Sequence, residues 1–144
     1  MDLYHLPGFL GTKALFLSDL TLILIILSAV LLTIGVWLAR QAKFDAHRWV
    51  QTAAVLINAS VIVSVMIGSF RGYYLPEIPT RIGEPSIAVT TFHAAIGLFG
   101  FLFGTFVMLR GNNLVPKGLR FSNYKLFMRV SYAIYMLATL TGIF

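Results

Sequence analysis

Cysteine is absent from this 144-residue chain, and charged residues make up only 11% of it. The lack of thiols excludes disulfides, thiolate metal sites, covalent attachment of c-type haem and cysteine nucleophiles. Soluble domains are usually about 25% charged. Because 58% of this sequence is hydrophobic and its mean hydropathy is +0.86, we predict an integral membrane protein.

Acidic residues are scarce as well: five Asp and Glu stand against eleven Lys and Arg, which gives a formal net charge of +6. A nucleic-acid interface needs basic residues clustered on one folded surface. Here the basic residues fall between long apolar runs, so we expect no nucleic-acid partner and take the lipid bilayer as the first partner of the chain.

Four apolar runs are long enough to cross the roughly 30 Å hydrocarbon core of a bilayer as helices. We therefore predict an all-α, single-domain, four-helix membrane bundle with helices at about 16–39, 48–70, 87–109 and 124–144. All five prolines lie outside these ranges, as helices in lipid require. Three of them fall in the segment YYLPEIPTRIGEP, which we expect to follow an extended or turn-rich path.

Basic residues are distributed unequally between the two sides of this bundle. Eight lie in or beside the first and third connections: Arg40, Lys43, Arg48, Arg110, Lys117, Arg120, Lys125 and Arg129. The other side has Lys13, Arg71 and Arg81. Because basic loops stay in the cytoplasm, we predict that both termini lie outside and that the protein is a multi-pass protein of the cell's inner (plasma) membrane.

Polar side chains form one stripe on the second predicted helix, where His47, Gln51, Ala54 and Asn58 are separated by four, three and four residues. Residues at this spacing share a helix face. Such a stripe serves either to hydrogen-bond neighbouring helices or to hold a ligand. The sequence leaves both interpretations open.

The third predicted helix repeats this spacing with His93, Gly97, Gly100 and Gly104. Glycines let a neighbouring helix approach closely, and they also leave room for a flat macrocycle beside a ligating imidazole. A histidine inside a membrane span is a candidate functional residue. Its alternative is a neutral ring satisfied by a helix carbonyl or a threonine.

His47 and His93 should lie about 25 Å apart in depth, because their helices run in opposite directions. They cannot bind one haem iron together, so each would need another ligand or a five-coordinate iron. The third histidine, His5, lies in the first ten residues, which either dock on the interface or a partner or form a disordered end. Met128 and Tyr124 are the candidate partners at the level of His47.

The segment from Lys43 to His47, the Phe92–His93 pair that heads the glycine stripe, and the closing Thr139–Gly142 resemble a family of small membrane proteins of unknown function associated with haem–copper oxidases. That family includes the CtaM-type cytochrome oxidase assembly factors. The similarity covers roughly residues 20 to 144, and it implies a helical bundle needed for a terminal oxidase to become active, with histidines that handle haem or copper. The chain departs from the family at 122–125, Ser-Asn-Tyr-Lys, where relatives often have another histidine.

Three functions follow from these features. The first is an accessory or assembly protein of a respiratory oxidase, with His93 and His47 as metal or haem ligands and Gly97, Gly100 and Gly104 beside the cofactor. The second is a b-type haem subunit for electron transport, and the third is a structural small subunit of a larger membrane redox complex. We expect no independent catalytic activity, because the sequence has no catalytic triad, carboxylate pair or phosphate-binding loop. Copper is less favoured than haem, since the methionines are not clustered.

Overall fold

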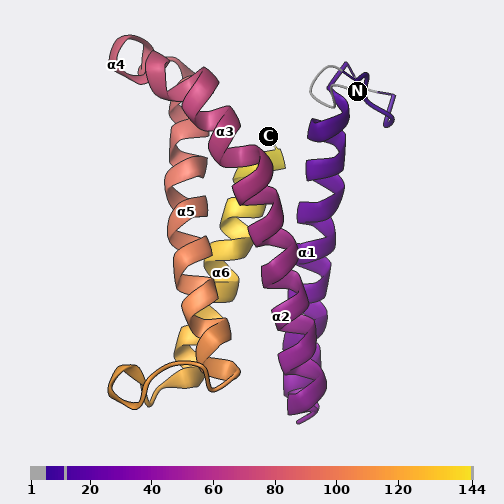
Figure 1. Ribbon diagram of the computed structural model, residues 1–144, viewed down its shortest axis with the longest axis vertical. Coiled ribbons are helices and arrows are strands. Elements are labelled where there is room, and N and C mark those ends of the chain that lie inside the picture. Colours follow the sequence, from indigo (N-terminus) through magenta and orange to yellow (C-terminus); the bar gives the residue numbers. More distant parts are fainter. Residues whose placement is uncertain (1–5, 12, 144) are drawn as a thin grey trace.

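The computed structural model describes residues 6–11 and 13–143. It has four long helices, each antiparallel to the next along the chain (Figure 1). No β-strand occurs within these described ranges. All four helices are long and apolar enough to cross a membrane. The prediction of an all-α chain with four membrane-length helices is confirmed.

The helical elements follow one another with short connections. Their order is α1 (Phe16–Arg40), α2 (Phe44–Val61), the π-helix η1 (Ile62–Met66), α3 (Ile67–Ser69), the π-helix η2 (Phe70–Tyr74), the 3₁₀ turn η3 (Leu75–Glu77), α4 (Ile78–Arg81), α5 (Pro85–Gly111), the 3₁₀ turn η4 (Lys117–Leu119) and α6 (Tyr124–Ile143). The first, third and fourth helices agree with the predicted ranges to within two residues at each end. Phe144, the predicted end of the fourth helix, lies outside the described residues.

The second helical segment differs most from its prediction. It begins at Phe44 rather than at about residue 48, and helical turns continue without a break to Arg81 instead of ending near residue 70. Of the predicted extended or turn-rich path, the extended form is wrong and the segment consists of helical turns. Pro76 and Pro79 each occupy the first turn of a short helix, where a missing N–H costs little. At about 1.5 Å per residue the segment is roughly 55 Å long, so it exceeds the hydrocarbon core.

The four long helices pack as two neighbouring pairs, α1 with α2 and α5 with α6, joined by contacts between α2 and α5 and between α1 and α6. A small buried cluster of Leu32, Ala54 and Tyr135 unites α1, α2 and α6. Many large apolar side chains remain exposed, including Trp49 and Leu102. This surface suits lipid, in which apolar side chains need no protein cover.

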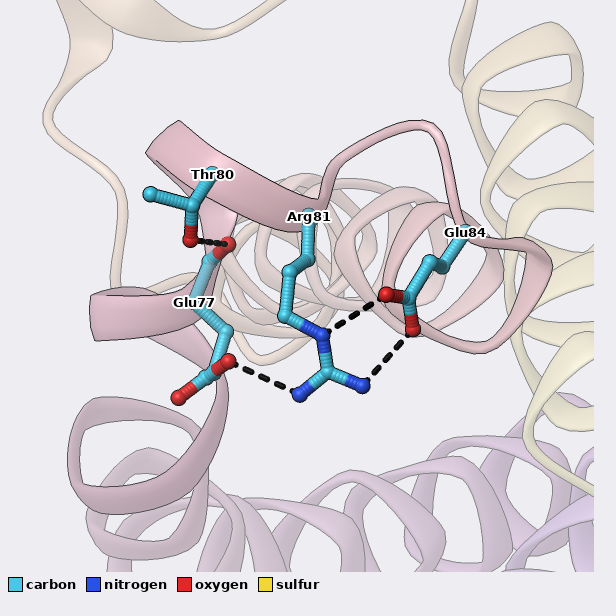
Figure 2. A network of polar contacts seen from close by, with 4 residues as sticks. All are labelled: Glu77, Thr80, Arg81 and Glu84. Atoms are coloured by element: carbon cyan, nitrogen blue, oxygen red, sulfur yellow. Dashed lines mark hydrogen bonds and ion pairs between the residues drawn. The ribbon is translucent and has the colours of Figure 1, made fainter.

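Three charged residues close the turn between α4 and α5 (Figure 2). The Arg81 guanidinium donates from Nε and Nη2 to the two carboxylate oxygens of Glu84, at 2.8 and 2.7 Å, and from Nη1 to Glu77 at 2.9 Å. These bonds favour the ionised carboxylate, so Arg81 lowers the pKa of Glu84 below its ordinary value. The group ties the end of α4 to the start of α5.

The chain before α1 folds back over the first turn of that helix. The Gly8 N–H donates to the Ala14 carbonyl at 3.0 Å, and the Phe16 N–H donates to the Leu6 carbonyl at 2.9 Å. The Asp19 carboxylate, only 2% exposed, accepts the Leu10 N–H at 2.8 Å. Residues 6–10 of the ten-residue start are therefore held against α1, whereas residues 1–5 lie outside the described part of the chain.

Candidate functional site

A largely apolar cavity of about 570 Å³ lies between the α2–η2 segment, α5 and α6. Figure 1 shows these three segments side by side in the half of the bundle nearer α4. We call it the His93 cavity; its polar lining residues are Asn58, Ser69, Arg71, Tyr74, Thr90, Thr91, His93, Tyr135 and Thr139. Ligand sites typically enclose about 300–1,000 Å³ and combine apolar walls with a few polar groups, so this cavity is the candidate functional site.

His93 reaches the cavity from α5, and its ring is held against α6. Its Nδ1 lies 3.1 Å from the Ala138 carbonyl oxygen and 3.3 Å from the Thr141 hydroxyl. A carbonyl can only accept, so the bond to Ala138 places the proton on Nδ1. The Nε2 atom has no hydrogen-bond partner among the described residues.

Gly142 on α6 provides the space for this imidazole. A Cβ atom at that position would lie 2.6 Å from Cε1 of His93 and 3.1 Å from Nδ1. Real Cβ atoms do not approach so closely, so an alanine there would displace the ring. The position of His93 therefore depends on a glycine from another helix.

The predicted glycine stripe of α5 divides into two parts. Gly100 and Gly104 are buried under α6: a Cβ at Gly100 would meet Ile134 at 2.9 Å, and one at Gly104 would overlap the Tyr135 ring. Gly97 lines the cavity instead, and nothing lies within 4 Å of a Cβ built there. Gly104 therefore allows the close approach of α6, and Gly97 leaves open space in the cavity. Gly100 does both, because it contacts Ile134 of α6 and also lines the cavity.

Two residues that line the cavity have a buried hydroxyl group without a hydrogen bond. Tyr135 is 6% exposed, and its hydroxyl faces the Asn58 side chain without reaching ordinary hydrogen-bond geometry. The Thr91 hydroxyl on α5 is also buried and unpaired within the described chain. Buried polar groups normally find partners, so these two hydroxyls are exceptions. Both oxygens are almost completely inaccessible to solvent, so a ligand in the cavity would reach them only after a side-chain movement.

The predicted stripe on α2 also serves two purposes. His47 bonds through Nδ1 to the Gly35 carbonyl of α1 at 2.7 Å, and the Gln51 amide donates to the Leu32 carbonyl at 3.1 Å. The Gln51 side chain fills the space above Gly35. His47 and Gln51 thus cross-link α1 and α2, whereas Asn58 lines the His93 cavity.

The structure does not bring the two histidines together. His47 lies in the first turns of α2, while His93 contacts the last turns of α6, at the opposite end of the bundle (Figure 1). Across the described residues, no three His, Cys, Asp or Glu side chains are grouped to hold a metal ion. His5 falls outside the described part, and Tyr124 packs on Gly111 and Arg110 rather than on His47.

Several cavity residues could not be assigned from the sequence. Met66 and Arg71 lie in the π-helices η1 and η2, and both line the His93 cavity. A π-turn adds a residue to the helical turn and so moves the following side chains around the axis. A periodicity of 3.6 residues therefore cannot assign Met66 and Arg71 to the cavity. The polar residue Asn58, one turn before η1, is the one signal in this helix that points to the cavity.

Comparison of the chain with models of known protein families, with curated proteins and with solved structures finds no match.

Proposed function

We propose that the protein is an integral membrane accessory or assembly protein of a respiratory haem–copper oxidase, and that it binds haem in the His93 cavity. The observation that carries the proposal is the hydrogen bonding and position of the His93 ring. Its Nδ1 donates to a backbone carbonyl, Nε2 is without a protein partner, and the ring lines an apolar space of about 570 Å³.

The residues present fit a haem group. Histidines that bind metals usually donate their other ring N–H to a carbonyl or carboxylate, which fixes the tautomer, and His93 makes this bond with Ala138. The open position at Gly97 leaves space on the same wall for a flat ring. When bound, haem would supply a redox-active iron. The protein's own residues hold the imidazole and provide an apolar wall for the ring.

His93 alone carries this proposal. His47 makes the interhelical bond to Gly35 at the other end of the bundle, and the role of His47 as a haem ligand stays a prediction. A subunit for electron transfer between two bis-histidine haems would need four imidazoles, and the sequence has three histidines. The structural-subunit alternative is favoured by the same two histidine–carbonyl bonds, which on their own are typical of helix packing.

We further propose that both termini lie outside the cytoplasm, in the inner (plasma) membrane of a cell. The eight basic residues near the α1–α2 and α5–α6 connections support this orientation. Those two connections lie at the end of the bundle opposite α4 (Figure 1). The His93 cavity would then open in the outer half of the membrane, where subunits of an oxidase would be its partners.

Absorption spectra of the full chain purified from haem-replete membranes test the proposal. The wild-type protein should show a Soret band, and His93→Ala should lose it while remaining monodisperse. His47→Ala and His5→Ala are the matched histidine controls, and both should keep the band. A colourless wild-type protein that co-purifies stoichiometrically with an oxidase would contradict haem binding and establish the structural alternative.

A further inference from the structure

The side of the His93 cavity nearest α4 is formed by the π-helix η2. This five-residue turn contributes Phe70, Arg71 and Tyr74 to the wall, and η1 contributes Met66 one turn earlier. π-Turns are rare, and they occur frequently at functional sites. Here they bring a cationic side chain to the margin of an otherwise apolar space.

Arg71 has no hydrogen bond or ion pair with any described residue. The acidic side chains nearest to it along the chain, Glu77 and Glu84, are both held by Arg81. Asp19 is directed to the Leu10 N–H in the loop before α1. Asp45 lies at the start of α2, beside Arg48. No described carboxylate therefore neutralises the guanidinium that borders the cavity.

Uncharged polar residues lie farther along the cavity from Arg71. Tyr135 is more than nine-tenths buried and its hydroxyl has no hydrogen bond, while Asn58 lies beside it. Most of the remaining cavity wall is apolar, and Gly97 leaves open space beside it. The cavity therefore combines one cationic side chain with a largely apolar space.

We propose that the His93 cavity selects an amphipathic ligand with an acidic head group, which Arg71 binds while the apolar body of the ligand lies along Gly97. A guanidinium matches the two oxygens of a carboxylate or phosphate. The inference rests on the proposed function, because haem is such a molecule: its propionate side chains are carboxylates. The phosphate of an anionic lipid is the second source of the same chemistry.

Binding of ferric haem and of its dimethyl ester tests whether the acidic groups are recognised, since the ester has the same ring but no acidic groups. Both are titrated into the purified full chain in nanodiscs of zwitterionic lipid and followed by absorbance. The wild-type protein should bind the free acid about tenfold more tightly than the ester, as expected for one charge-assisted pair. Arg71→Gln should remove this preference, and Arg71→Lys should restore part of it.

Lys13→Gln is the matched control, because it removes another positive charge from the same end of the bundle, and Lys13 is exposed and does not line the cavity. It should keep the wild-type preference. Equal binding of acid and ester by a wild-type protein that binds haem would overturn the role of Arg71 and leave the proposed function intact. A loss of preference in Lys13→Gln equal to that in Arg71→Gln would also overturn it.

A third arm uses nanodiscs that contain phosphatidylglycerol, with the retained lipid counted by native mass spectrometry. If the wild-type protein binds neither tetrapyrrole, the proposed function fails. Phosphatidylglycerol retained by the wild type and lost in Arg71→Gln would then still support an acidic head group at Arg71, with lipid as its source. Equal retention by both proteins would overturn the inference.

Discussion

Gly104→Ala should destabilise the protein, whereas Gly97→Ala, two turns away on the same face of α5, should not. A Cβ at Gly104 would lie 2.9 Å from the Tyr135 hydroxyl oxygen and 3.0 Å from Cζ, with Cε2 closer still. Tyr135 cannot move aside easily, because it is buried in the cluster with Leu32 and Ala54. At Gly97 the added methyl group enters open space.

The matched pair isolates the packing cost. Replacing glycine by alanine in a helix favours folding by about 0.5–1 kcal/mol, and this gain is common to both variants. Overpacking a filled core typically costs about 1–3 kcal/mol. Gly104→Ala should therefore be less stable than Gly97→Ala by about 1–3 kcal/mol.

Reversible unfolding in detergent, followed by circular dichroism, measures the free energies of both variants. Tyr135→Leu removes the obstructing ring, so it should reduce the additional cost of Gly104→Ala in a double-mutant cycle. Equal stability of Gly104→Ala and Gly97→Ala would refute the division of the glycine stripe. The division would also be refuted if Gly104→Ala lowered the free energy of unfolding as much in the Tyr135→Leu background as in the wild type.

Three further outcomes are expected. Gly142→Ala should displace the His93 ring and break its bond to Ala138, which weakens haem retention; Gly72→Ala, with open space around it, is the control. His47→Ala should cost about 0.5–1.5 kcal/mol of unfolding free energy through the lost interhelical bond, with no change in the Soret band. Arg81 lowers the pKa of the Glu84 carboxyl in the folded state. The stabilisation from the Glu84–Arg81 bond is therefore fully present above the pKa of Glu84 in the unfolded chain, and it is lost as the pH falls through the pKa in the folded state. The protection of amides in the α4–α5 turn, relative to the intrinsic exchange rate at each pH, should fall below about pH 4 in the wild type, and Arg81→Gln should remove this pH dependence.

The sequence predicted the four helices well because lipid imposes a simple rule: a span needs about 20 apolar residues and internal hydrogen bonds. The same rule underestimated the second helix. Its final turns, from Arg71 to Arg81, lie beyond the apolar run, and their prolines were interpreted as helix breakers. Pro76 and Pro79 instead occupy first turns, a position that depends on how neighbouring turns are hydrogen-bonded.

The candidate site was predictable only in its parts. The 4, 3, 4 spacing identified His93 and Gly97 as residues on one face, and a helix carbonyl was one of the expected partners of the imidazole. The spacing could not identify Ala138 as that carbonyl or distinguish Gly97 from Gly104, because both facts depend on where α6 crosses α5. Arg71 was assigned to topology alone, since a π-turn leaves no periodic signal.

The ratio of haem to protein, measured by pyridine haemochrome assay on the full chain purified from haem-replete membranes, tests the central claim most directly. Wild-type protein and Gly72→Ala should contain stoichiometric haem. His93→Ala, which removes the proposed ligand, and Gly97→Phe, which fills the cavity from a position with open space around it, should both contain little or none while unfolding cooperatively. Haem content unchanged by either variant, or absent from the wild-type protein, would contradict the account.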